Sequence, residues 1–180
     1  MAKSNRELLI TLGADTTTFS QKVKRAKDLT KELDSNFKLL SSSSKNFEKS
    51  IDGLGKKQEY LNDKVKVATT LNDVYIERLK DQQDSLNKST QAMEKLVNEL
   101  EELKDVQKDS LDTAEWDAWQ KEIDKVEDEL AQVRKETKNF QDSVINLNTA
   151  IDKNQADIQK MNLLFALAHH LCLCEEIWQQ

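Results

Sequence analysis

The sequence contains no proline, and only 3 of its 180 residues are glycine. Both residue types interrupt helices, so their scarcity leaves long stretches of chain free to remain helical. Aromatic residues make up 6% of the chain and charged residues 33%. This composition is typical of long helices or coiled coils. Intrinsic disorder is the alternative, because a highly charged chain with few hydrophobic residues gains too little from burial to offset its ordering entropy.

The sequence also has few residues with which to build a catalytic centre. Its only histidines, His169 and His170, are adjacent, so no Ser-His-Asp or Cys-His arrangement can be distributed over a scaffold. Its only cysteines, Cys172 and Cys174, are too close for a disulfide framework and lack the second ligand pair of a structural zinc site. The glycines of IDGLGKK have neither the spacing nor the preceding strand of a phosphate loop. We therefore expect no enzymatic activity, no cofactor and no metal site.

Long apolar runs are also missing. The opening MAKSNRELLITL lacks the apolar core of a signal peptide, and no run approaches the ~20 residues that a membrane span needs. We therefore expect synthesis in a cytoplasm and no membrane span.

The net charge of −6 is unevenly distributed along the chain. Residues 1–60 carry 12 Lys and Arg against 8 Asp and Glu, a net of +4, which leaves −10 for the remainder. Neither part combines a dense basic cluster with stacking aromatic residues, so we expect no specific binding of nucleic acid. A solvated surface of mixed charge accounts for the asymmetry, and head-to-tail or antiparallel contacts are the alternative.

What is present is a heptad pattern. From Phe19 to Gln107 the apolar residues recur in a strict 4-3 alternation, which predicts a long helix over 16–107 and argues against disorder. The stripe is narrow, so we expect it to face one partner helix and not to be buried on several sides. Polar residues interrupt it at Asn72, Gln82, Ser89 and Gln107, where they can fix the register.

Two short segments within 41–56 predict a break in this helix. LLSSSSKNF replaces good helix formers with serines, which compete for backbone hydrogen bonds. IDGLGKK places two glycines within three residues, and each costs a helix about 1 kcal/mol relative to alanine.

The heptad phase slips at 108–115 and resumes from Trp116 to Met161, which predicts a second heptad helix over 116–161. At the joint, Asp112 and Glu115 have the spacing of a capping box at a helix N-terminus. The joint is either a hairpin turn or a stutter in a continuous coil, and we expect the hairpin. In a hairpin Trp116 and Trp119 would pack its open end; a binding hot spot is their alternative role.

The N-terminal residues 1–15 follow a different pattern. ELLITL places three apolar residues on one face, which predicts a short β-strand: Leu8, Ile10 and Leu12. Gly13 ends the strand, and Asp15 or Thr16 can cap the following helix; a frayed helix start is the alternative. The predicted fold class is therefore all-α, with long coiled-coil helices or a helical hairpin and a short N-terminal β-strand.

LLITLGADTTTFSQKVKRAKDLTKELDSNFKLL resembles the N-terminal region of tail tape-measure proteins from long-tailed phages and prophages of Gram-positive bacteria. In that family a short strand, a glycine and a D-T-[ST]-x-[FL] turn lead into long coiled helices. The matching positions here are Gly13, Asp15, Thr16, Thr17 and Phe19. KKQEYLNDKV and LDTAEWDAWQKEIDKVEDELAQV are similar to later helices of the family. The resemblance covers about residues 5–155 and is most specific in the first forty.

The resemblance implies a structural protein that acts as a tail-length ruler, around which tail tube subunits polymerise in the host cytoplasm before it becomes part of the phage tail. Its implied partners are further copies of itself, tail assembly chaperones, the tail tube protein and tail-tip or baseplate proteins. Leu8–Leu12 would then pair with another copy or a tail protein, or remain loose in an isolated monomer. A bacterial coiled-coil adaptor or tether without a phage role is the alternative function.

Length and the last residues suggest a piece of such a ruler. A fully helical chain of this size spans at most roughly 270 Å, and family members run several times longer, so we expect an N-terminal fragment. Residues 162–180 form an apolar tail that contains every histidine and cysteine, and a frameshift would produce so abrupt a change. The alternative is an amphipathic segment that covers the end of the bundle.

Overall fold

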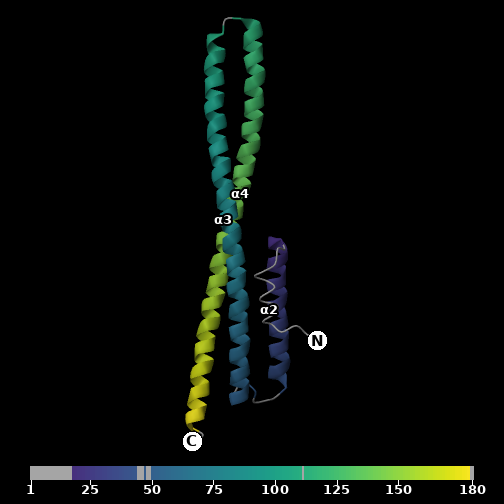
Figure 1. Cartoon of the computed structure of the whole chain (residues 1–180), viewed down its shortest axis with the longest axis vertical. Helices are drawn as coiled ribbons and strands as arrows, with labels where there is room; N and C mark the ends of the chain where they lie inside the picture. Colours follow the sequence, from purple (N-terminus) through teal and green to yellow (C-terminus); the bar gives the residue numbers. More distant parts are fainter. Residues whose placement is uncertain (1–17, 44–46, 48–49, 111, 179–180) are drawn as a thin grey trace. The chain divides into compact units, whose positions relative to one another are not determined.

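The protein is represented by a computed structural model that describes residues 18–43, 47, 50–110 and 112–178 (Figure 1). Nearly all of these residues lie in three helices: α2 (Phe19–Ser42), α3 (Ile51–Asp109) and α4 (Thr113–Trp178). None of the described residues lies in a strand, so the predicted all-α class is confirmed for this part of the chain. The predicted strand Leu8–Leu12 lies outside the described residues.

The chain divides into two compact units. Unit 1 consists of residues 1–78 and 149–180, and unit 2 of residues 79–148. The described part of unit 1 therefore contains α2, the first part of α3 and the last part of α4. Unit 2 contains the rest of α3 and α4 with the turn between them.

Unit 2 is a helical hairpin. Its arms are antiparallel, with Ser89 of α3 opposite Thr137 of α4, at 2.7 Å between their hydroxyl oxygens. The arms are joined where the heptad phase slips, since α3 ends at Asp109 and α4 begins at Thr113. The carboxylate of Asp112 accepts a hydrogen bond from the Ala114 N–H at 2.7 Å and so caps α4.

In the expected capping box, the Glu115 side chain would accept a hydrogen bond from the backbone N–H of Asp112, but Glu115 has a different partner. The carboxylate of Glu115 accepts a hydrogen bond from the Ser110 hydroxyl at 3.3 Å. That hydroxyl follows directly after the end of α3, so Glu115 ties the two ends of the turn together.

The seam between α3 and α4 follows the heptad register of the sequence. Ile123, Val126 and Leu130 are 2–4% exposed, and the later positions of the second stripe, as far as Met161, are buried or half-buried. Such a seam is stabilised by apolar burial at about 25 cal/mol per Å² removed from water.

In unit 1, α3 is the middle one of three helices, with α2 and α4 against different faces (Figure 1). One face carries the predicted heptad stripe, and Asn154 of α4 donates a hydrogen bond to the Ala68 carbonyl there at 2.7 Å. The other face packs Val67 against a buried cluster of α2: Ala26, Leu29 and Leu33. The expectation of a stripe too narrow for burial on several sides is therefore wrong for this part of α3.

The apolar surface of α3 in unit 1 is widened by a second 4-3 series. It lies one residue before the first series and comprises Tyr60, Lys64, Val67, Leu71 and Val74. Two adjacent heptad series give a helix two usable faces, which a single narrow stripe does not.

The connection between α2 and α3 falls inside the 41–56 stretch where the sequence predicts a break, and serines form its edges. The hydroxyls of Ser41, Ser42 and Ser43 donate to backbone carbonyls three residues earlier, at 2.6–3.1 Å. The hydroxyl of Ser50 accepts the Gly53 N–H at 3.0 Å and caps α3.

Gly53 and Gly55 do not break α3, so the prediction made from IDGLGKK is wrong for these two residues. Both lie inside α3, and neither has a positive φ. A Cβ atom on Gly53 would collide with the backbone carbonyl of Phe47, whereas a Cβ atom on Gly55 would meet nothing within 4 Å. Gly53 therefore allows the connection to approach the first turn of α3 closely.

The two remaining boundaries also differ from the sequence expectation. Thr18 occupies the N-cap position of α2, in place of Asp15 or Thr16, and its N–H donates to the Gln21 side chain at 3.3 Å. At the other end, α4 continues to Trp178 through the segment 162–178 that was expected to be a separate tail. Leucine and alanine are strong helix formers, and this segment has no proline or glycine to stop the helix. Within the described helices, none combines the length and apolar character of a membrane span.

Candidate functional site

Two groups of residues singled out from the sequence lie outside the described part of the chain. They are the predicted strand residues Leu8, Ile10 and Leu12, and four residues of the turn that resembles tape-measure proteins: Gly13, Asp15, Thr16 and Thr17. Phe19 is described and begins α2, with its ring 6.0 Å from that of Tyr75 in α3. The guanidinium of Arg78 lies 6.0 Å from the centre of the Phe19 ring, a cation–π distance. Phe19 therefore attaches the start of α2 to α3.

Trp116 and Trp119, the two tryptophans singled out from the sequence, belong to unit 2, whereas Phe19 belongs to unit 1. Trp119 is half-buried, and it lines a shallow cavity of about 490 Å³ at the hairpin turn. Trp116 is 44% exposed, more than a residue that only packs the hairpin end needs to be.

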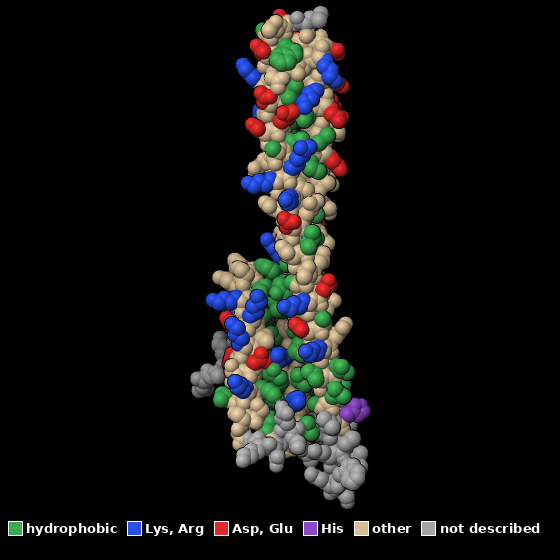
Figure 2. All heavy atoms as spheres, turned by 180° about the vertical axis from the view of Figure 1, so that it is seen from behind, with side chains coloured by type: hydrophobic (Ala, Val, Ile, Leu, Met, Phe, Trp, Pro, Cys, Tyr) green, Lys and Arg blue, Asp and Glu red, His purple; other side chains and the backbone are tan. Residues whose placement is uncertain are grey.

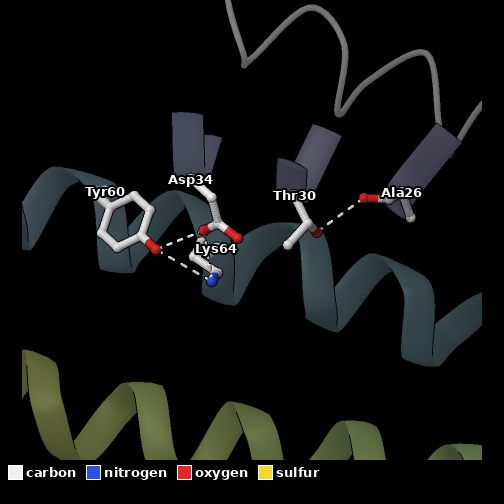
Figure 3. Close-up of polar contacts among 5 residues, drawn as sticks. All are labelled: Ala26, Thr30, Asp34, Tyr60 and Lys64. Carbon is white, nitrogen blue, oxygen red and sulfur yellow. Dashed lines mark hydrogen bonds and ion pairs between the residues drawn. The ribbon is translucent and has the colours of Figure 1, made fainter. Parts of the chain in front are cut away.

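A polar cluster joins α2 to α3 in unit 1 (Figure 3). The hydroxyl of Tyr60 and the ammonium of Lys64 both donate to Oδ1 of Asp34, at 2.6 and 2.8 Å. Lys64 Nζ also lies 3.2 Å from the Tyr60 hydroxyl oxygen, which closes the triangle. The ring of Phe37 stacks on the ring of Tyr60, with 4.3 Å between the ring centroids and an angle of 12° between the ring planes. These contacts fix how α2 lies along α3.

The charges of the cluster support each other. Partial burial raises the pKa of Asp34, but the hydrogen bonds from Lys64 and Tyr60 and the charge of Lys64 outweigh it, so the net pKa is lowered. Partial burial lowers the pKa of Lys64, but its interactions with Asp34 and Tyr60 outweigh this and raise it. Burial and the hydrogen bond to Asp34 raise the pKa of Tyr60. The pair is therefore ionised at neutral pH and has the chemistry of a structural ion pair.

An open cleft of about 490 Å³ lies next to this cluster in unit 1, and we call it the apolar cleft. α2, α3 and α4 all contribute to it. Its apolar lining comprises Leu61, Val67, Ala68, Leu71, Met161 and Leu164. Its charged lining comprises Lys57, Lys64, Asp157 and Lys160. Figure 2 shows hydrophobic side chains along the middle of this unit, with lysine and arginine side chains on both sides. Such a surface suits an apolar side chain or helix with acidic neighbours.

The histidines do not gather other ligands around them in the described part of the chain. His169 Nδ1 lies 3.5 Å from the side-chain nitrogen of Gln58, and His170 is exposed. Within the described residues, no three His, Cys, Asp or Glu side chains lie close enough together to hold a metal ion.

Sequence reasoning did not find the Asp34–Tyr60–Lys64 cluster. The signal that contains it is the second 4-3 series, in which Tyr60 and Lys64 are the first two members. Asp34 follows directly after the core residue Leu33, but nothing in its own helix indicates which lysine it meets.

Comparison with known proteins gives no match: no family model, curated protein or solved structure is detectably similar to the chain.

Proposed function

We propose that the chain is a structural and assembly protein of a phage tail, where it acts as part of the tape measure. The observation that supports this role best is the pairing of two helices of 59 and 66 residues along a heptad seam. A ruler needs length and regular rise, which such helices provide at 1.5 Å per residue. The sequence from Gly13 to Phe19, which ends at the start of α2, resembles the corresponding sequence of tape-measure proteins.

The proposed role is structural and requires no catalytic centre. The chain would act in the host cytoplasm during assembly and then in the tail. Its partners would be further copies of itself, tail assembly chaperones, tail tube subunits and tail-tip or baseplate proteins. The segment Leu8–Leu12 would form a strand that pairs with one of these partners.

The hairpin makes the ruler hypothesis quantitative. In a hairpin two residues, one in each arm, share each 1.5 Å of length. Duplicating residues 79–106 together with the opposite residues 120–147, in the phage that encodes the chain, adds 28 residues to each arm. The mean tail length in electron micrographs should then increase by about 42 Å if the hairpin persists, or by about 84 Å if the arms extend in one line.

Two results would contradict the proposal. Tails of unchanged mean length would exclude a ruler role for this segment, and purified tails that lack the chain by mass spectrometry would exclude a place in the virion.

A coiled-coil adaptor or tether without a phage role is the second candidate, and the apolar cleft is the observation in its favour. A rod that only measures length has no need of an apolar cleft with lysines at its edge. Genes for tail tube and chaperone proteins beside the coding gene would favour the ruler, and a metabolic or secretion operon would favour the adaptor.

A further inference from the structure

The turn of unit 2 carries an exposed apolar surface among carboxylates. Val106 and Trp116 are 47% and 44% exposed, and Val106 lines the shallow cavity together with Trp119. The carboxylates of Asp109 and Glu115 line the same cavity. We call these five residues the acidic tip. Tryptophan is enriched among the residues that contribute most to protein interfaces, and polar groups usually lie around them.

The position of Asp109 is unfavourable for its own helix. It is the last residue of α3, where the helix dipole is negative and a cation is preferred. Helix stability therefore does not account for an acid here. The surrounding unit adds to the negative field: residues 79–148 contain 10 Lys and Arg against 18 Asp and Glu, a net of −8.

The apolar cleft has the complementary character. Unit 1 contains 17 Lys and Arg against 15 Asp and Glu, a net of +2. Lys57 and Lys160 at the cleft form no ion pair with any described residue, whereas Lys64 is held by Asp34. Asp157 is the one carboxylate in the described lining of the cleft. Leu61 and Leu164 are among the apolar side chains that line the same cleft.

We propose that copies of this chain associate head to tail, with the acidic tip of one copy seated in the apolar cleft of the next. Trp116 provides the apolar anchor, and the carboxylates of Asp109 and Glu115 face Lys57 and Lys160. Pairing of two tips, or of two clefts, would bring like charges together and is disfavoured. A contact between two different surfaces leaves one of each free on every assembly, so association continues beyond the dimer unless a ring closes.

Sedimentation velocity of the full chain over a range of concentrations tests this directly. The wild type should form species larger than a dimer, and added salt should weaken them because it screens the charges at the contact. A cleft variant carries Lys57→Glu and Lys160→Glu, and a tip variant carries Asp109→Lys and Trp116→Ala. Each variant alone should lose about tenfold or more in association constant, because it has one functional surface and one defective surface.

The decisive sample is an equimolar mixture of the two variants. The cleft variant retains its tip, and the tip variant retains its cleft, so the mixture should form a heterodimer and nothing larger. An interface that pairs tip with tip, or cleft with cleft, cannot give this result, since the variant that retains that surface would then dimerise by itself and the other variant would not join it.

Two matched controls separate the contact from general effects. Lys88→Glu with Lys138→Glu changes the net charge by the same amount within unit 2 and should not weaken association. Ile145→Ala removes a side chain that is 61% exposed and lies away from the tip, and should also leave association unchanged. Circular dichroism melts of all variants should match the wild type, which excludes unfolding as the cause of a loss.

The proposal is overturned if the folded wild type remains monomeric at every concentration, or if the variant mixture forms no heterodimer. It is equally overturned if either variant alone still forms the large species.

Discussion

At the scale of single residues, the two glycines of α3 make the sharpest comparison, because they are two positions apart and have different surroundings. Gly53→Ala should lower the free energy of unfolding by about 1–3 kcal/mol, since the new methyl group collides with the Phe47 carbonyl and the connection must move. Gly55→Ala should raise it by about 0.5–1 kcal/mol, because the site is open and alanine restricts the unfolded chain.

Urea unfolding of the two variants, followed by circular dichroism, measures both values. Equal effects at the two positions would show that helix propensity alone decides and that the close approach of Phe47 to α3 does not occur.

The ion pair between Asp34 and Lys64 predicts a pH dependence. The folded-state pKa of Asp34 lies below its ordinary value of 3.8, so its contribution to stability is complete above that pH and is lost as the pH falls through the folded-state pKa. The folded-state pKa of Lys64 lies above its ordinary value of 10.5, so its contribution is complete below that pH and is lost as the pH rises further.

Asp34→Asn should therefore destabilise the protein at pH 7 by about 0.5 kcal/mol, a small value because solvent screens a half-exposed pair. The difference from the wild type should shrink as the pH falls below 3.8 and through the folded-state pKa of Asp34. Asp28→Asn is the control, since Asp28 and Lys31 are exposed and lie 3.9 Å apart. A difference between wild type and Asp34→Asn that is independent of pH would contradict the ion pair.

At the scale of the helix, the polar residues of the seam divide into two kinds. Ser89 meets Thr137, and Gln107 donates to Gln120 at 3.0 Å, so each has a partner across the hairpin. Gln82 is 8% exposed, and its side-chain amide has no hydrogen-bond partner among the described residues. A buried amide without a partner loses its hydration without compensation.

Gln82→Leu should consequently raise the free energy of unfolding by about 1–2 kcal/mol. Gln107→Leu should raise the free energy of unfolding by less than this or lower it, because the substitution removes the hydrogen-bond partner of Gln120. Thermal unfolding compares the two variants, and a loss of stability in Gln82→Leu would show that this amide is hydrogen-bonded in the seam.

At the scale of the whole molecule, a hairpin and a continuous coil differ in how heptad deletions should affect stability. Residues 93–99 of α3 lie opposite residues 127–133 of α4 in the register set by Ser89 and Thr137. Removing both heptads keeps every remaining layer matched. Removing 93–99 alone leaves a heptad of α4 without a partner and displaces the Asp112 cap.

The paired deletion should thus melt at a higher temperature than the single deletion, although it removes twice as many residues. Circular dichroism at 222 nm measures both transitions. If stability simply follows the number of residues that remain, the arms are not paired in this register.

The parts of the fold that could be predicted from the sequence depend on the spacing of apolar residues along the chain. A side chain at every third or fourth position returns to the same helix face, so the stripe from Trp119 to Met161 could be assigned without any knowledge of its partner. The turn between Asp109 and Thr113 was marked by the phase slip and by Asp112. Because the chain has no proline, long helices could be predicted from its sequence. For the same reason α4 continues through residues 162–178, where the change of composition had suggested that the helix ends.

The parts that were missed depend on contacts between distant segments. Tyr60, Lys64 and Val67 lie in a second heptad series that is visible in the sequence, but only the packing of α2 shows that this series is buried. Gly53 was predicted to break the helix, because helix propensity describes only the preference of a residue within its own helix. Its position is explained by the Phe47 carbonyl beside it, which leaves no space for a side chain.

The sequence by itself therefore determined the helical class, the seam register and the position of the turn, because each follows from periodicity along one chain. The tertiary structure decided that α3 has two buried faces in unit 1, that Asp34 meets Tyr60 and Lys64, and that lysines edge an apolar cleft. A helix records in its own sequence which of its faces are apolar. Which partner covers each face is set by burial and electrostatic contacts with segments far away in the chain, and these exist only in the folded molecule.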